Sequence, residues 1–257
     1  MMPQRQAGRR VLVTGAASGI GAAISRQYLQ EGAALVLIDV NAQALAAHAE
    51  SLAEIGGQVV WAVANVADYR ACEAALAQVR AKLDGDIDIL INNAGISPKT
   101  NGKPANFWEM DPDEWQRVVG VNLHGAFNWA RLLTPAMVRN RFGSIVNMSS
   151  VAGKAHLTFT AAHYGTTKAA LIGLTRDLAG ELGPHGITVN AIAPGRINTP
   201  LMRTASPETN LAVIQETALR RLGEPQEVAE MSCFLTSPES RFVTGQVVDV
   251  AGGWMMT

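Results

Sequence analysis

The chain has 257 residues, 48% of them hydrophobic, and a formal net charge of -1. This length and composition suit a single α/β domain with a large core, and the near-neutral charge gives no reason to expect a nucleic acid or an anionic membrane as partner. No stretch approaches the ~20 apolar residues of a membrane span, and residues 1–10 lack the apolar segment of a secretory signal. Cys72 and Cys233 are too few for a disulfide framework, so we expect a cytoplasmic protein.

A glycine-rich turn joins the first predicted strand to the first predicted helix. Residues 10–14 predict a short buried strand, and Gly15, Gly19 and Gly21 precede a helical pattern that runs to about residue 30. Glycine lets the backbone approach a ligand closely, and a helix N-terminus offers unpaired N–H groups to a pyrophosphate. The spacing is G-x-x-x-G-x-G rather than the commoner G-x-G-x-x-G. By itself it predicts either a phosphate-binding loop or a tight turn between strand and helix.

A carboxylate ends the second predicted strand. Residues 33–39 form an apolar run that closes on Asp39, and the next residue, Val40, is not a cation. A carboxylate at this point can accept hydrogen bonds from the adenosine ribose and would repel a 2′-phosphate. The pattern therefore favours NAD over NADP. The alternative is that Asp39 only caps the helix expected over residues 41–54.

The rest of the chain continues the alternation of strands and helices. Strands are predicted over 58–64, 86–92, 144–148, 188–192 and 246–250, and helices up to about 83, over 122–137, around Tyr164 and after Pro225. Such alternation implies a doubly wound parallel sheet of about seven strands, covered by helices on both faces, in a single domain 1–257. A loop at about 196–222 is expected to be mobile and to fold over a substrate.

Tyr164 and Lys168 lie four residues apart in a stretch with a helical apolar pattern, so both side chains share one face. A free phenol titrates near ~10 and is a poor base at neutral pH. An ammonium ~4 Å away would favour the phenolate by roughly 4 kcal/mol at an effective dielectric constant of ~20, or about three pKa units. The pair predicts a general acid/base. An isolated Tyr-x-x-x-Lys is more often a half-buried aromatic beside a solvated lysine.

Together these motifs resemble those of the short-chain dehydrogenase/reductase family over nearly the whole chain. The matching positions stand in the family's order: Thr14-Gly15-x-x-x-Gly19-Ile20-Gly21, Asp39, Asn65-Val66, Asn92-Asn93-Ala94-Gly95, Asn122, Ser149-Ser150, Tyr164-x-x-x-Lys168, and Pro194-Gly195 with Thr199. The resemblance implies a Rossmann-type fold, NAD as cofactor, oxidation of a secondary alcohol to a ketone, and a homotetramer.

The resemblance also implies roles for single residues. Tyr164 would be the acid/base, and Ser150 would hydrogen-bond the substrate oxygen. Lys168 would lower the tyrosine pKa and hold the nicotinamide ribose, while Asn122 would support a water that relays protons to Lys168. The implied cofactor contacts are Gly15, Ser18, Gly19, Ile20 and Gly21 at the pyrophosphate, Asp39 at the adenosine ribose, Asn65 and Val66 at the adenine, Asn93, Ala94 and Gly95 at the inner ribose, and Pro194, Gly195, Ile197 and Thr199 at the nicotinamide.

Two positions depart from the family's usual pattern. Ser150 lies one residue farther from Tyr164 than in most relatives, which predicts a one-residue bulge within 151–163. Ser149 is therefore a rival for the catalytic serine, although Ser150 is favoured because it directly precedes Val-Ala-Gly. Asn65 stands where many relatives carry aspartate, and its amide oxygen can still meet the adenine amino group.

Other conspicuous side chains receive structural interpretations. The five histidines show no metal-ligand spacing, so we expect no metal, and His163 is interpreted as incidental. Trp108, Trp115 and Trp129 are expected in packing. Trp254 is expected either at a subunit interface or near a neighbouring active site.

The substrate prediction rests on polar and basic residues in the loops that should border the pocket. Lys99, Lys154, His156, Arg196 and Arg203 outnumber large apolar residues there, which favours a small polyol, sugar or sugar acid, with any anionic group held by Lys99, Lys154, Arg196 or Arg203. The alternative reading of these cations is a solvated surface. Two other functions stay open: a 3-oxoacyl-thioester reductase, which would prefer NADPH, and a nucleotide-binding relative without turnover.

Overall fold

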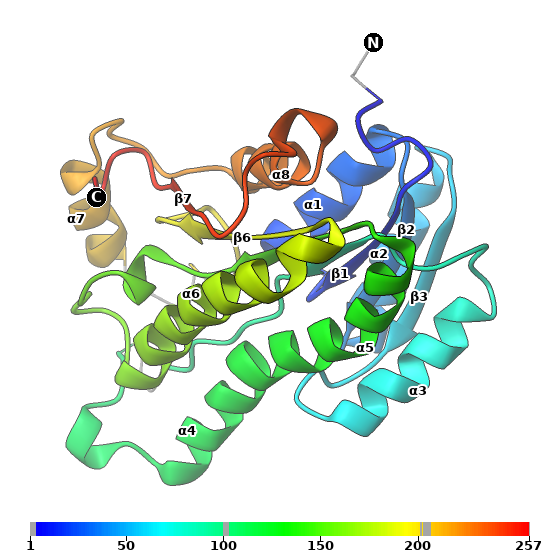
Figure 1. Cartoon of the computed structure of the whole chain (residues 1–257). Coiled ribbons are helices and arrows are strands. Elements are labelled where there is room, and N and C mark those ends of the chain that lie inside the picture. The colour runs from blue at the N-terminus through cyan, green and yellow to red at the C-terminus, as the bar shows by residue number, and fades with distance from the viewer. Residues whose placement is uncertain (1–3, 100–102, 201, 203–206, 257) are drawn as a thin grey trace.

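The computed structural model describes residues 4–99, 103–200, 202 and 207–256, and its centre is one parallel sheet (Figure 1). In the described part of the chain, seven strands pair in the order β3-β2-β1-β4-β5-β6-β7. The strands are β1 (Arg10–Thr14), β2 (Ala34–Asp39), β3 (Val59–Val63), β4 (Ile89–Asn92), β5 (Gly143–Met148), β6 (Ile187–Pro194) and β7 (Val247–Val250). The predicted Rossmann-type α/β fold is confirmed.

Helices cover both faces of this sheet (Figure 1). One face carries α1 (Gly19–Gln30), α2 (Ala42–Ala53) and α8 (Pro225–Leu235), and the other carries α3 (Tyr69–Arg80), α5 (Gly125–Asn140) and α6 (Ala162–Leu182). Successive strand residues point to opposite faces, so Leu12 packs in the cluster of Trp129, whereas Val13 packs in the cluster of Tyr28. This double burial explains why the strands read as continuous apolar runs.

The chain reverses its direction across the sheet between β1 and β4. β1 pairs with β2 on one side and with β4 on the other, so Val11 lies opposite both Leu35 and Ile89. Parallel sheets bind ligands at such a switch point, outside the carboxyl ends of the strands. The glycine turn after β1 and the Asn93 loop after β4 meet there. The topology therefore brings two of the sequence motifs together.

The structure adds two helices that the sequence pattern did not predict. α4 (Pro112–Val119) is capped by the Asp111 side chain, which accepts a hydrogen bond from the Asp113 N–H at 2.9 Å, and a π-helical turn at Gly120–His124 joins it to α5. The Asp-Pro start is a recognisable helix signal that the prediction of a helix over 122–137 overlooked. α7 (Pro207–Glu216) occupies part of the predicted loop at 196–222. Among the described residues, no helix is long and apolar enough to span a membrane.

Candidate active site and nucleotide site

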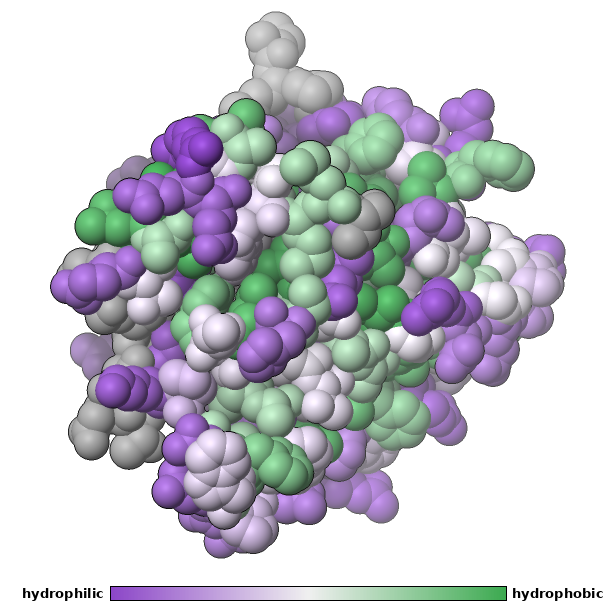
Figure 2. All heavy atoms as spheres, turned by 90° about the vertical axis from the view of Figure 1, so that its left-hand side faces the viewer, coloured by the Kyte–Doolittle hydropathy of each residue, from purple (hydrophilic) through white to green (hydrophobic). Residues whose placement is uncertain are grey.

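A pocket of about 420 Å³ opens at the carboxyl ends of the strands. The face of the molecule seen in Figure 2 shows hydrophobic side chains gathered near its centre and hydrophilic ones around its edge. Almost all the predicted site residues line the pocket: Gly15, Ser18, Gly19, Ile20, Asp39, Asn65, Val66, Asn93, Ala94, Gly95, Ser150, Tyr164, Lys168, Pro194, Gly195, Ile197 and Thr199. Gly21 and Asn122 lie just behind this wall. One cavity thus joins the predicted nucleotide and catalytic residues.

The glycine loop is tightly packed against the loop that follows β4. A Cβ on Gly15 would lie 2.8 Å from the Cα of Ala94, and one on Gly21 would lie 2.1 Å from the carbonyl oxygen of Gly15. The Asn93 amide nitrogen donates to the carbonyl oxygens of Thr14 and Gly15 at 2.9 and 3.1 Å. Side chains are therefore excluded where α1 begins, and its N-terminal N–H groups remain open to a ligand. This cradle fits the pyrophosphate of a dinucleotide.

Asp39 lies at the far end of the pocket from Tyr164. One carboxylate oxygen accepts the Ala17 N–H at 3.0 Å and the other accepts the Asn41 N–H at 2.9 Å. Asn41 caps α2 by accepting the Ala44 N–H, so the reading of Asp39 as a mere helix cap is wrong. Among the described lysines and arginines, Lys99, Lys168 and Arg196 line the pocket. None of the three is adjacent to Asp39 in the sequence, and none belongs to the glycine loop.

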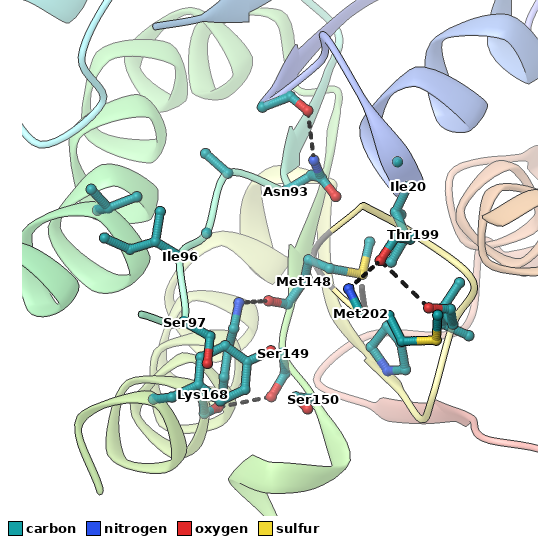
Figure 3. Close-up of a pocket in the computed structure, with 18 of the residues that line it drawn as sticks. Ile20, Asn93, Ile96, Ser97, Met148, Ser149, Ser150, Lys168, Thr199 and Met202 are labelled. Atoms are coloured by element: carbon teal, nitrogen blue, oxygen red, sulfur yellow. Dashed lines mark hydrogen bonds between the residues drawn. The ribbon is translucent and has the colours of Figure 1, made fainter. Parts of the chain in front are cut away.

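Tyr164 and Lys168 occupy successive turns of α6, as the spacing predicts. The Lys168 Nζ lies 5.6 Å from the centre of the Tyr164 ring and donates to the Met148 carbonyl oxygen at 2.7 Å (Figure 3). The Ser149 hydroxyl donates to the Lys168 carbonyl oxygen at 2.8 Å. Ser150 caps the short helix at Val151–Gly153 and is close enough to Tyr164 to influence its pKa. The geometry thus directs Ser150, and not Ser149, to the phenol.

Burial dominates the titration of this pair. It raises the pKa of Tyr164, which the Ser150 hydroxyl and the Arg196 charge lower to a smaller extent. It lowers the pKa of Lys168 to about 8. The sequence argument expected the lysine to bring the tyrosine pKa down, but in this structure the ammonium is directed to the Met148 carbonyl and is not among the groups that lower it. Burial therefore disfavours the charged form of each group, relative to the same group in water.

The Asn122 side chain makes three hydrogen bonds to protein groups. Its oxygen accepts the Ile96 N–H at 2.8 Å, and its nitrogen donates to the Ile96 carbonyl oxygen at 3.0 Å and to the Thr167 hydroxyl at 3.2 Å. The residue is 1% exposed and lies in the π-helical turn. These bonds hold the Asn122 side chain against the loop that follows β4, and its oxygen keeps one further acceptor site.

The predicted basic border of the pocket divides into residues that face the cavity and residues that do not. Arg196 and Lys99 line it. Lys154 instead forms a 2.7 Å ion pair with Asp249, so its predicted role in anion binding is wrong. His156 borders a separate, neighbouring cavity. Arg203 lies outside the described residues.

The sequence analysis did not assign three side chains to the site: Phe159, which lines the pocket, and Asn210 and Glu216, which hold lining side chains in place. The Arg196 guanidinium donates to the Asn210 side-chain oxygen of α7 and lies 5.1 Å above the Phe159 ring. Phe159 stacks on Trp254 at 5.7 Å, and the Trp254 indole N–H donates to Glu216 at 3.0 Å. These contacts join segments that are far apart in the chain, so no local sequence pattern could predict the roles of Phe159, Asn210 and Glu216.

The tryptophans and histidines that were expected to be structural differ in their burial. Trp129 is completely buried, as predicted, whereas Trp108 is 80% exposed, so its expected packing role is wrong. His163 is also buried, and its Nε2 lies 3.0 Å from a Glu114 carboxylate oxygen, which attaches the start of α6 to α4. Within the described ranges, no three histidine, cysteine, aspartate or glutamate side chains gather as a metal site.

Sequence comparison places these features in a family. The family model described as enoyl-(acyl carrier protein) reductase matches residues 15–255. The chain belongs to the short-chain dehydrogenase/reductase family. It is therefore an oxidoreductase of this family that acts on CH–OH groups and uses a nicotinamide cofactor.

Individual members of the family differ in the substrates that their names give. A 3-oxoacyl-[acyl-carrier protein] reductase from Brucella melitensis, solved with bound NAD, is 49% identical with a TM-score of 0.94, over 99% of this chain and 94% of that one. The 3-oxoacyl-[acyl-carrier-protein] reductase FabG of Thermotoga maritima is 38% identical over 97% of this chain and 98% of its own. The 2-dehydro-3-deoxy-L-rhamnonate dehydrogenase (NAD(+)) of a Sphingomonas species is 38% identical, over 97% and 96%.

Proposed function

We propose that this protein is an NAD(H)-dependent oxidoreductase that interconverts a secondary alcohol and a ketone with Tyr164 as acid/base. The observation that carries the proposal is the single pocket that holds Tyr164 and Ser150 at one end and the glycine cradle with Asp39 at the other. The bound nicotinamide would supply or accept the hydride. Thr199, Ile197, Pro194 and Gly195 line the same pocket and would hold the nicotinamide there.

The side chains near Tyr164 would handle the proton. In reduction the Tyr164 hydroxyl donates a proton to the ketone oxygen, and in oxidation the phenolate accepts it. The Ser150 hydroxyl donates a hydrogen bond to the same oxygen and stabilises the charge that develops on it. The Lys168 ammonium, with two N–H donors beyond the one given to Met148, would hold the ribose hydroxyls.

The cofactor preference is proposed from Asp39. Its carboxylate is fixed by two backbone N–H groups at the place where an adenosine ribose would lie. Such a carboxylate accepts the ribose hydroxyls and repels a 2′-phosphate. The bound NAD of the Brucella melitensis structure supports the choice. Asn65 and Val66 would border the adenine.

Two substrate classes have support. The names of the Brucella melitensis and Thermotoga maritima proteins favour a 3-oxoacyl thioester, so the alternative of the sequence analysis is better supported by the comparisons than a polyol or simple sugar. A sugar acid is the second candidate, since the Sphingomonas relative is named for one and the pocket is lined by Arg196 and Lys99.

Initial rates at the NADH absorbance test the reaction and the substrate together. Acetoacetyl-coenzyme A is tested as a substrate for reduction, and aldonates, 3-deoxy-2-oxo sugar acids and the matching polyols are tested for oxidation. Each substrate is assayed once with NAD(H) and once with NADP(H). The proposal predicts turnover with NAD(H) that Tyr164→Phe removes. A chain that binds NADH and turns over nothing in the panel would instead be a nucleotide-binding relative.

Assembly, location and loop motion belong to the same proposal. A homotetramer, the family's usual form, predicts a light-scattering mass near four times 27.3 kDa. A cytoplasmic location is proposed from the two free, buried cysteines. The segment 196–222, which includes α7, is proposed to cover a small-molecule substrate, so hydrogen exchange in α7 should slow when substrate binds.

A further inference from the structure

Among the described residues that line the catalytic end of the pocket, two besides Lys168 are cations and none is a carboxylate. Arg196 and Lys99 both line this end; burial lowers the pKa of Lys99, and the nearby Arg196 charge lowers it further. Asp39 is the one carboxylate among the described residues that line the cavity, and it lies at the opposite end, held by the glycine loop. Two partly buried cations near one another are unfavourable unless an anion joins them.

Arg196 is held in place by neutral groups. Its Nε and Nη2 both donate to the Asn210 side-chain oxygen, at 2.9 and 2.5 Å, and its flat face lies over Phe159. Phe159 is backed by Trp254, which Glu216 fixes through the indole N–H. A guanidinium has five N–H donors, and one amide oxygen satisfies only part of them. The described partners of Arg196 thus orient the guanidinium and carry no charge that would neutralise it.

The position of this charge relates it to the reaction. Arg196 is one of the groups that lower the pKa of Tyr164, so the guanidinium lies near the phenol that would exchange a proton with the substrate. In a 3-oxoacyl thioester the groups next to the reacting ketone are uncharged, and the nearest phosphate is separated from it by the whole pantetheine arm. Such a substrate would bring no negative charge close to Arg196. The carboxylate of a hydroxy acid or an oxo acid would form an ion pair with it.

We propose that Arg196, assisted by Lys99, binds a carboxylate close to the reacting carbon, so that the enzyme's substrate is a short hydroxy acid or oxo acid. This inference rests on the proposed oxidoreductase activity and selects the acid over the thioester. Arg196 acts as a specificity residue, and Asn210 positions it. Phe159 and Trp254 form the apolar wall beside the carboxylate.

Calorimetric titration of the NADH-saturated protein measures ligand affinity without turnover, so it tests whether the charge of Arg196 binds a carboxylate. Ligands are compared in matched pairs: 3-hydroxybutyrate against its N-acetylcysteamine thioester, and gluconate against sorbitol. A charge-assisted pair contributes enough for the acid to bind about 10- to 100-fold more tightly than its neutral counterpart. Equal binding within each pair, or no binding of either acid, overturns the inference.

Three variants locate the effect. Arg196→Gln removes the charge, and Asn210→Asp keeps the side-chain shape but neutralises Arg196 in place; each should abolish the preference for the acid and leave the neutral ligand within about twofold. Arg196→Lys should restore part of the preference, since it returns the charge without the planar fork. The control is Lys103→Gln, because Lys103 is an exposed cation four residues after Lys99 that does not line the cavity. This variant should leave the affinities for acid and neutral ligand unchanged.

The outcomes separate this inference from the proposed function. If Arg196→Gln and Asn210→Asp weaken acid and neutral ligand alike, Arg196 is structural and the inference fails. If the acids bind as expected but Tyr164→Phe leaves turnover unchanged, the proposed acid/base fails while the carboxylate site stands. Turnover of the thioester with no preference for the acid would leave the oxidoreductase intact and remove the inference.

Discussion

Removing the charge of Asp39 should narrow the protein's preference for NAD. A 2′-phosphate about 4 Å from this carboxylate would be disfavoured by about 1 kcal/mol in a water-like medium and about 4 kcal/mol at an effective dielectric constant of about 20. Asp39 is half-buried beside the glycine loop, so its surroundings lie between these limits. A tenfold preference needs about 1.4 kcal/mol. We therefore expect NADH to bind at least tenfold more tightly than NADPH. Asp39→Asn should reduce this ratio of dissociation constants by a similar factor.

Nucleotide affinity can be measured without a known substrate. Titrations of NADH and NADPH, followed by energy transfer from tryptophan to the nicotinamide, give the two dissociation constants for each variant. Glu50→Gln, which removes an exposed carboxylate from α2 outside the pocket, controls for net charge and should leave the ratio unchanged. An unmutated protein that binds both nucleotides equally, or an Asp39→Asn ratio equal to that of the control, would refute the reasoning.

Three further outcomes follow from the site. Tyr164→Phe should leave no more than a few per cent of turnover while the NADH dissociation constant stays within about twofold, whereas Lys168→Ala should impair both; substantial activity in Tyr164→Phe would place the acid/base elsewhere. Because burial lowers the pKa of Lys168 to about 8 against 10.5 in the unfolded chain, the ligand-free protein should gain stability towards unfolding by urea as pH rises from 8 to 10, and Lys168→Met should lack this slope. Gly21→Ala should weaken NADH binding more than tenfold, since its Cβ would lie 2.1 Å from the Gly15 carbonyl oxygen, while Gly173→Ala, which meets nothing within 4 Å, should bind normally.

The proposed cofactor site was readable from the chain because its parts are local motifs. The glycine turn needs only the spacing of Gly15, Gly19 and Gly21, and the Tyr164–Lys168 pair needs only one helical turn. The regular alternation of strands and helices then restricts the sheet to a doubly wound order, which places every strand's carboxyl end at one edge. Helix α4, which was not predicted, also has a local signal, its Asp111-Pro112 start.

The sequence by itself determined the fold, the family and the residues expected at the nucleotide, since these depend on neighbours within a few positions and on the period of each element. Only the tertiary structure decided which cations face the pocket: Lys154 pairs with Asp249 of β7, whereas Arg196 is held by Asn210 above Phe159. It also decided which way Lys168 points, towards the Met148 carbonyl. Partners of this kind are brought together by the packing of distant segments, and a side chain's charge reveals nothing about its partner until that packing exists.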